Sequence, residues 1–222
     1  MVTGLPPAVI LAAGFSTRMG RDKARLPIPG GGWFLSRLAR TLLAAGCPEA
    51  IAVVGPLGDE IHAAAARERL PVRFVVNPDP SRGQLSSLQE ALAVLVEREP
   101  RGLLMSPVDQ PIVRVETVRL VIEEWSRSAA AVVRPSWRGR HGHPVLFDRR
   151  VLEDLRQADA AAGARAVVHA RAGETRDVEV DDPGAFEDID TPEDYRRVFG
   201  VALADVEASA TSPPAGRPPA RR

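Results

Sequence analysis

The stretch Ala8-Val-Ile-Leu-Ala-Ala-Gly-Phe-Ser-Thr-Arg-Met-Gly-Arg-Asp-Lys23 decides the fold of this chain. Its first six residues, Ala8 to Ala13, form an apolar run that suits a strand covered on both faces. The loop that follows contains two glycines and the basic residues Arg18 and Lys23. Glycines allow a sharp turn and bring backbone N–H groups close to a phosphate. The stretch therefore predicts a buried strand ending in an anion-binding loop; the alternative is a glycine turn with exposed bases.

Lys23 is unusual because it is the only lysine among 29 basic residues. Lysine and arginine are not equivalent where a compact, flexible point charge is needed instead of a planar fork. A phosphate contact beside a glycine-rich turn is such a place. We therefore expect Lys23 to bind phosphate; the alternative is a lysine retained by chance on a solvated surface.

Short apolar runs and longer amphipathic segments alternate along the chain. Strand-like runs follow at residues 51–55, 72–76, 103–105 and 130–134. Apolar residues spaced three and four apart predict helices at residues 34–45, 85–96 and 114–127. This alternation predicts an α/β fold, in which a mostly parallel mixed sheet carries helices on both faces.

The pattern changes after residue 135. A short strand at 144–147 begins with Pro144, which predicts an edge position because proline cannot donate to a strand ladder. The remaining predicted elements are helices near 149–157 and 163–170, a strand at 175–180, and a last helix opened by Thr191 and Pro192.

Length and composition limit the classes of protein to consider. A chain of 222 residues can bury one core, and we assign residues 1–200 to a single domain. The stretch 205–222, rich in Ala, Pro and Ser, is predicted to be a disordered tail. Acidic and basic residues balance at 29 each, which leaves no overall field to attract nucleic acid or a membrane surface. No apolar stretch is long enough for a membrane span, so we expect a cytoplasmic protein.

Carboxylates follow two of the predicted elements. Asp109 comes at the end of a central strand, so we expect it to face Lys23 across a common cleft at the carboxyl edge of the sheet. A carboxylate facing a triphosphate most usefully holds Mg²⁺. Asp188 and Asp190 lie two apart in an extended segment, and either is a candidate second ligand. The alternatives are a turn at Asp109 and a simple helix lead-in at Asp190.

Two further segments are candidates for binding. Gly83-Gln-Leu-Ser86-Ser87 opens a predicted helix, where free N–H groups and hydroxyls suit an anion or a nucleobase edge; helix capping by Ser86 is the competing explanation. The basic, glycine-containing segment 134–144 includes Arg140 and His143 and is predicted to hold a phosphorylated second substrate. Its two histidines lack the further ligands of a zinc site.

Five segments, in order, resemble the MobA-like nucleotidyltransferases. The signature is Leu11-Ala-Ala-Gly-x-Ser-x-Arg-Met-Gly-x-x-Lys23. The later segments resemble the molybdenum cofactor cytidylyltransferase branch; they are Gly83-x-x-Ser-Ser-Leu88, Asp109-Gln-Pro111, Arg140-His-Gly-His-Pro-Val-Leu-Phe147 and Asp188-Ile-Asp-Thr-Pro-Glu-Asp194. The resemblance covers about residues 7 to 200.

The resemblance implies a single-domain, Rossmann-like fold similar to the GT-A glycosyltransferases. It implies transfer of CMP from CTP to the phosphate of molybdopterin with release of diphosphate, and a molybdoenzyme or its chaperone as a further partner. Mg²⁺ would be held by Asp109 with Asp190, and the catalytic residues would be Arg18, Lys23 and Asp109. The nucleotide would contact Leu11, Ala12, Ala13, Gly14, Arg18, Lys23, Gly83, Ser86, Ser87 and Asp109, and the second substrate Gln110, Arg140 and His143.

Other functions remain open on the sequence alone. A guanylyltransferase or a sugar-phosphate nucleotidyltransferase would have the same fold. A non-catalytic protein that binds the nucleotide or chaperones the cofactor is a third candidate, although binding alone does not need the carboxylate of Asp109. The glycine spacing does not match the dinucleotide fingerprint of a dehydrogenase.

Overall fold

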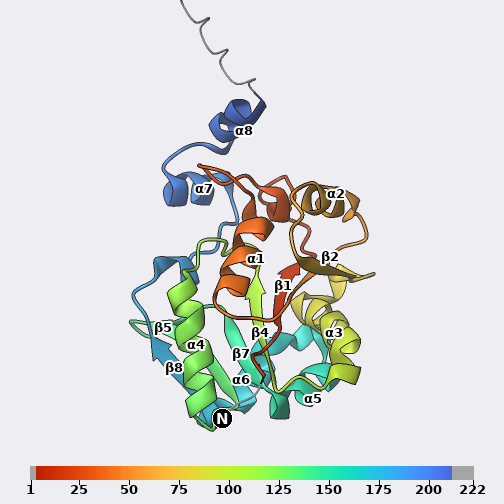
Figure 1. The fold of residues 1–222 in the computed structure, drawn as a ribbon, viewed down its shortest axis with the longest axis vertical. Coiled ribbons are helices and arrows are strands. Elements are labelled where there is room, and N and C mark those ends of the chain that lie inside the picture. The colour runs from red at the N-terminus through yellow and green to blue at the C-terminus, as the bar shows by residue number, and fades with distance from the viewer. Residues whose placement is uncertain (1–3, 212–222) are drawn as a thin grey trace, which may run out of the picture.

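A computed structural model describes residues 4–211 of the chain. Within this range a single mixed sheet has the strand order β3-β2-β1-β4-β7-β5-β6, and β8 pairs with β5 outside this path (Figure 1). The strands are β1 (Ala8–Ala12), β2 (Ala50–Val54), β3 (Val72–Val76), β4 (Gly102–Pro107), β5 (Val132–Trp137), β6 (Arg140–His141), β7 (Val145–Asp148) and β8 (Thr175–Glu179).

The first four strands are parallel, so their carboxyl ends meet at one edge of the sheet. β1 lies between β2 and β4, with Leu11 in register with Val53 on one side and Pro107 on the other. β3 extends the parallel set next to β2. In an open parallel sheet, this edge is where loops form a ligand site.

Helices cover both faces of the sheet, as Figure 1 shows. Helices α1 (Phe34–Ala44) and α4 (Val115–Arg127) pack on one face, and α3 (Gln84–Leu95), α5 (Arg149–Gln157) and α6 (Gly163–Ala170) on the other. Helices α2 (Asp59–Arg67), α7 (Pro192–Phe199) and α8 (Leu203–Thr211) complete the described set. Short 3-10 turns lie at Lys23–Arg25, Pro80–Arg82, Val96–Arg98, Ala160–Ala162, Ala172–Glu174 and Pro183–Ala185.

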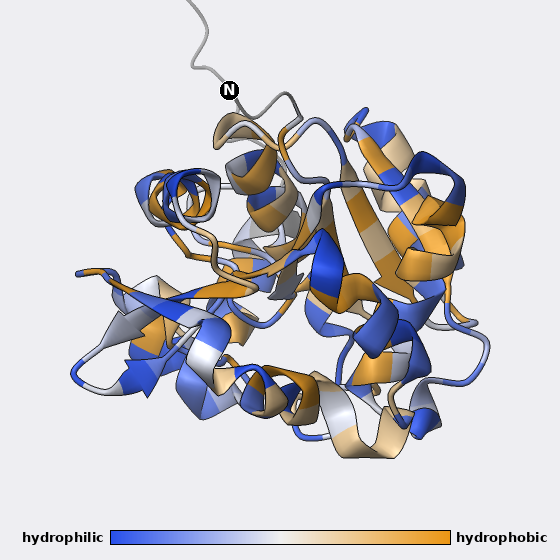
Figure 2. Cartoon of the chain, turned by 90° about the horizontal axis from the view of Figure 1, so that it is seen from below, coloured by the Kyte–Doolittle hydropathy of each residue, from blue (hydrophilic) through white to orange (hydrophobic). Residues whose placement is uncertain are grey.

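The core consists of two apolar layers, because neighbouring side chains of a strand point to opposite faces. Ile10 of β1 packs with the α1 and α4 layer, whereas Val9 and Leu11 pack with the layer of α3 and α5. In Figure 2 the central strands are largely orange, while the helices carry blue segments on their outer sides. Burying each large side chain stabilises the fold by about 1.5–3 kcal/mol. The predicted α/β fold with helices on both faces is thus confirmed.

One strand does not lie where its sequence predicted. β7 is an interior strand, antiparallel to both β4 and β5, and the predicted edge position is wrong. Pro144 is the cause of the error. It precedes Val145, the first residue of the strand, so its missing N–H leaves no gap in the ladder.

The predicted disordered tail begins too early. Residues up to Thr211 are helical in α8, where a tail was expected from residue 205. Leu203 is buried against the domain, and Glu207 forms an ion pair with Arg21. These tertiary contacts stabilise a helix that composition alone did not favour. Residues 212–222, the rest of the predicted tail, lie outside the described residues.

In residues 4–211, no helix is both long and apolar enough to cross a membrane.

Candidate active site

A cavity of about 250 Å³ lies at the carboxyl edge of the parallel strands. Three segments far apart in the sequence form most of its wall: residues 11–23 after β1, residues 80–87 around the start of α3, and residues 107–109 after β4. Asp190, from the segment that leads into α7, completes it. The cavity therefore depends on the parallel order of β1 and β4 and on the return of the chain after β8.

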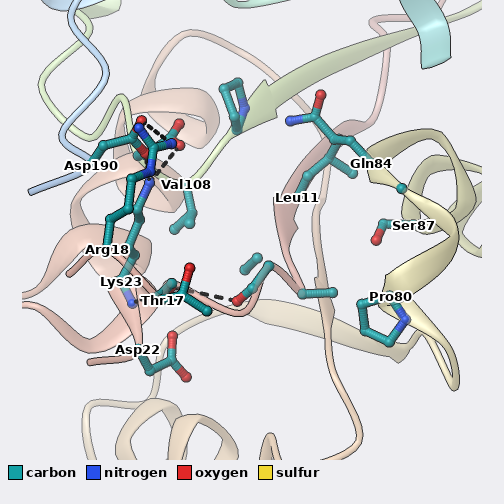
Figure 3. Close-up of a pocket in the computed structure, with 17 residues that line it drawn as sticks. Leu11, Thr17, Arg18, Asp22, Lys23, Pro80, Gln84, Ser87, Val108 and Asp190 are labelled. Carbon is teal, nitrogen blue, oxygen red and sulfur yellow. Dashed lines mark hydrogen bonds and ion pairs between the residues drawn. The ribbon is translucent and has the colours of Figure 1, made fainter. Parts of the chain in front are cut away.

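The charged end of the cavity is centred on Lys23. Its Nζ donates to Asp109 Oδ2 at 3.0 Å and also forms an ion pair with Asp190 Oδ1. Arg18 forms an ion pair with the other oxygen of Asp190, and Figure 3 shows these side chains together on one side of the cavity. The predicted cleft is present, but Lys23 and Asp109 touch directly instead of facing each other across a gap.

Local structure of the glycine loop holds Lys23 in place. The backbone N–H of Lys23 donates to Ser16 Oγ at 3.2 Å, and the Asp22 carboxylate accepts from the N–H of Ala24, which caps the 3-10 turn. Only 9% of Lys23 is exposed. The alternative of a lysine on a solvated surface is therefore wrong.

The burial of these charges changes their protonation. Burial favours the neutral amine of Lys23, but the carboxylates of Asp109 and Asp190 outweigh it, so the pKa of Lys23 is raised. Burial also raises the pKa of Asp109; the Lys23 ammonium opposes this change, whereas Asp188 and Asp190 add to it. The site thus combines one buried cation with several acids that repel one another.

Asp188 and Asp190 have different surroundings. Asp190 lines the cavity, while the exposed Asp188 accepts a hydrogen bond from Gln110 Nε2 at 2.7 Å. The backbone N–H of Ile189 donates to the carbonyl of Asp109 at 3.0 Å and ties this segment to the loop after β4. Of the two candidates for a second carboxylate, Asp190 is the one that meets Lys23.

The opposite end of the cavity is neutral. Gly83, with a φ of +101°, lies directly before α3 and lets Gln84 and Ser87 line the cavity near Leu11 and Pro80. In Figure 3 Gln84, Ser87, Leu11 and Pro80 lie across the cavity from Arg18 and Lys23. Sites for small organic groups are mostly apolar with a few well-placed hydrogen-bonding groups, and this end combines Leu11 and Pro80 with the polar side chains of Gln84 and Ser87.

Most of the residues selected from the sequence meet in this cavity. Those that line it are Leu11, Ala12, Ala13, Gly14, Arg18, Lys23, Gly83, Ser87, Asp109 and Asp190. Ser86 does not line it; its fully buried hydroxyl donates to the Gly83 carbonyl, and among the described residues no side chain caps the start of α3, so the capping explanation is wrong as well. Sequence reasoning missed the contributions of Asp22 and Gln84, although both lie within segments that it had selected, and that of Pro80, which lies outside them.

The three residues expected to bind a second substrate lie outside the cavity wall. Gln110 is buried and holds Asp188. Burial lowers the pKa of His143 to about 4, against the opposing effect of Asp188, and the backbone N–H of His143 donates to Ala185. Arg140 donates to the carbonyl of Phe186 and lies over its ring. In this structure Arg140 and His143 join the segment 139–144 to the segment 183–190, and Gln110 joins the loop after β4 to the same segment.

The donor set suits a hard divalent cation. Asp109 and Asp190 bring carboxylate oxygens within reach of one Lys23 Nζ, so the two carboxylates converge. The residues described contain no group of three or more His, Cys, Asp or Glu side chains arranged around a metal position. Mg²⁺ is usually bound by one or two carboxylates together with substrate phosphates, so a pair of acids fits that ion.

Comparison with known proteins places the chain among nucleotidyltransferases. A family model described as "MobA-like NTP transferase domain" matches residues 8–176. Molybdenum cofactor cytidylyltransferase of Escherichia coli K12 is 27% identical over 187 residues, which cover 84% of this chain and 92% of that protein. Nicotine blue oxidoreductase of Paenarthrobacter nicotinovorans is 33% identical over 210 residues, 89% of this chain and 98% of that protein.

A further relative and a solved structure come from Mycobacterium tuberculosis H37Rv. A probable molybdenum cofactor guanylyltransferase is 31% identical over 157 residues, 71% of this chain and 74% of that protein. The crystal structure of Rv0371c superposes with a TM-score of 0.76 at 29% identity, covering 90% of this chain and all of that one. The same protein has also been crystallised in complex with manganese. With the glycine loop, the buried lysine and the paired acids in one cavity, these matches identify the chain as a nucleotidyltransferase that belongs to the family of MobA-like NTP transferase domains.

Proposed function

We propose that this enzyme transfers CMP from CTP to the terminal phosphate of molybdopterin and releases diphosphate. The observation that carries the proposal is the polarity of the cavity. One end presents Arg18, Lys23 and two carboxylates, and the other presents a neutral surface with a serine hydroxyl. A nucleoside triphosphate has the same polarity, with an anionic chain at one end and a base at the other.

The residues at the charged end suit transfer of a nucleotidyl group. The incoming phosphate is already a nucleophile, so the reaction needs no catalytic Ser-His pair. The barrier arises from repulsion between anions and from charge that builds on the leaving diphosphate, and positioning with electrostatic stabilisation lowers it. Arg18 and Lys23 would neutralise the β- and γ-phosphates, and backbone N–H groups near Ala13 and Gly14 would hold the nucleotide.

Asp109 and Asp190 would hold Mg²⁺, which when bound neutralises phosphate charge and helps to align the reacting groups. In the structure both carboxylates contact the Lys23 ammonium. A lysine side chain has a flexible four-carbon stem, so Lys23 can move from the carboxylates to the phosphates once a cation neutralises the acids.

The choice of CTP rests on the later sequence segments. They resemble the cytidylyltransferase branch, and the cytidylyltransferase of Escherichia coli matches over 84% of this chain. The mycobacterial guanylyltransferases match over 71% of it. Guanylyl transfer to the same acceptor is therefore the second candidate, and the expected compartment of either reaction is the cytoplasm, where CTP and GTP are available.

The relative named as an oxidoreductase points to another class of reaction. Redox chemistry does not require a buried lysine that is paired with two acids beside a phosphate-binding loop. That arrangement supports group transfer.

The test is diphosphate release from CTP, GTP, UTP and ATP, each with Mg²⁺ and with or without purified molybdopterin. We expect release only when the pterin is present, fastest with CTP, together with a product that contains both pterin and CMP. Release that is fastest with GTP would replace the cytidylyl assignment by the guanylyl one. No release with any nucleotide would overturn the proposal.

A further inference from the structure

Asn77 is a buried residue next to the cavity. It directly follows β3, and none of its surface is exposed. Its backbone N–H donates to Val54 at 2.9 Å, which fixes its place at the carboxyl edge of the sheet. Asn77 does not line the cavity, but its side chain contacts a residue that does.

The side-chain amide of Asn77 uses all its hydrogen-bonding groups. Its Oδ1 accepts from the backbone N–H of Asp79 at 3.0 Å. Its Nδ2 donates to Ser86 Oγ at 2.9 Å and to Ser87 Oγ at 3.0 Å. A reversed amide would place its NH₂ group against the Asp79 N–H, donor against donor, so the orientation of the amide is determined.

This orientation decides what the two serine hydroxyls can do. Each hydroxyl oxygen accepts from Asn77, and a hydroxyl has only one hydrogen to donate. Ser86 donates that hydrogen to the Gly83 carbonyl at 2.7 Å. In the part of the chain that the structure describes, no hydrogen bond is donated by Ser87, which lines the cavity at its neutral end between Gln84 and Pro80 (Figure 3). The hydrogen of Ser87 is thus left for a ligand.

We infer that Asn77 is a positioning residue, which makes Ser87 a hydrogen-bond donor toward an acceptor atom of the nucleobase. The inference rests on the proposed function, because it needs the base at the neutral end of the cavity. Cytosine presents two adjacent acceptors, O2 and N3, on its pairing edge. The Ser87 hydroxyl has its hydrogen free and one of its two lone pairs occupied by Asn77, so it favours such an edge over one that presents a donor at the same place.

The variant Asn77→Asp tests the inference with almost no change in shape. A carboxylate has no hydrogen to donate, so both serines would donate to it, and the hydrogen of Ser87 would no longer reach the base. We expect the Kd and KM for CTP to rise about tenfold, while kcat changes less than about threefold. A role confined to holding the loop in place would not separate KM from kcat in this way.

A double-mutant cycle with Ser87→Ala shows whether the effect passes through Ser87. We expect the single variant Ser87→Ala to weaken CTP binding about tenfold and the double variant to bind no more weakly than either single variant. Independent effects would multiply to about a hundredfold, and that outcome would overturn the inference. Ser106→Ala is the matched control, since Ser106 is an equally buried serine on β4 that does not line the cavity; its Kd should equal that of the wild type.

Binding is measured by calorimetry on the full chain after thermal unfolding has shown that each variant is folded. Asn77→Ala replaces Asn77→Asp if the buried carboxylate prevents folding; it frees the Ser87 hydroxyl to turn toward the Gly83 carbonyl, and the same loss is expected. If the wild type binds no nucleoside triphosphate, the proposed function fails. If the wild type binds CTP and the Asn77 variants bind it equally well, only the role of Asn77 is refuted.

Discussion

A single ammonium group links two carboxylates that come from distant parts of the chain. Lys23 is 86 residues from Asp109 and 167 residues from Asp190 in sequence. A lysine suits this position because its charge is compact and can contact one oxygen of each carboxylate. The only lysine of the chain is therefore at a place where a planar guanidinium would be a poor replacement.

Replacing Lys23 by arginine keeps the charge and changes its shape. We expect Lys23→Arg to lower kcat by about 10²–10³-fold, because the wide fork cannot sit between the carboxylates and then turn to the phosphates. Turnover is measured as diphosphate release. Arg25→Lys, at an exposed residue that pairs with Glu60, is the control and should keep full activity. A Lys23→Arg enzyme with wild-type turnover would contradict the role assigned to the ammonium.

Removing the charge of Asp109 tests the metal site. In Asp109→Asn, Lys23 keeps Asp190 as a partner, and we expect a normal melting temperature. The Mg²⁺ concentration for half-maximal rate should rise at least tenfold, since one of the two carboxylate ligands is lost. Mn²⁺ binding, followed by electron paramagnetic resonance without any substrate, gives a second measurement. An unchanged metal titration would speak against Asp109 as a ligand.

His143 links stability to pH. Burial lowers its pKa from 6.5 to about 4, so between these values the unfolded chain binds a proton that the folded chain does not. Stability is therefore expected to fall as the pH is lowered from 6.5 to 4, by at most about 3 kcal/mol from this residue. Urea unfolding at several pH values checks this slope, which His143→Gln should flatten.

At the scale of elements, the start of α7 holds the second carboxylate in place. Thr191 Oγ1 accepts from the backbone N–H of Asp194, and the Asp194 carboxylate accepts from the N–H groups of Thr191 and Asp190. This capping box directly follows the last segment of the site, so the local geometry of a helix end determines where Asp190 lies.

Loss of the Thr191 cap should lower the stability of the fold and raise the Mg²⁺ concentration that the enzyme requires. We expect Thr191→Ala to destabilise the fold by about 1 kcal/mol and to raise the Mg²⁺ requirement two- to threefold, because Asp190 loses its rigid support. Ser126→Ala is a control on the exposed part of α4, where the hydroxyl bonds only to a carbonyl of its own helix. If the Thr191 variant is destabilised but its Mg²⁺ requirement is unchanged, the cap does not help to hold Asp190 in place for the metal.

The elements also show where sequence patterns mislead. Pro144 favours an edge position for the strand that follows it, yet it lies one residue outside β7, and the strand is interior. The polar composition of residues 205–211 argued against order, yet Leu203 and the pair of Arg21 with Glu207 dock α8 on the domain. At β7 an offset of one residue removed the conflict with proline. At α8 tertiary contacts outweighed a composition that favours disorder.

At the scale of the whole molecule, ligand binding should stabilise the folded state. The segments that form the cavity wall are far apart in sequence and come together only when the chain folds. A ligand that binds only the folded state stabilises it by about 2.7 kcal/mol at a concentration of 100 Kd. For a chain of this size we expect Mg²⁺ and CTP together to raise the Tm by about 5–10 °C. Differential scanning fluorimetry measures the shift. Asp109→Asn should lose most of it, and an equal shift in that variant would argue against a metal-assisted site.

The sequence by itself determined most of the strands and helices, although not α2, β6 or α8, together with the glycine loop with its lone lysine and most of the residues that line the cavity. These features depend on hydrophobic periodicity and on the conformational freedom of glycine, which act over a few residues. Only the tertiary structure decided that Asp190 and not Asp188 meets Lys23, that Ser87 and not Ser86 lines the cavity, and that Asn77 sets the direction of that hydroxyl. Such choices depend on distances of a few ångströms between segments brought together by folding, and no local pattern encodes them.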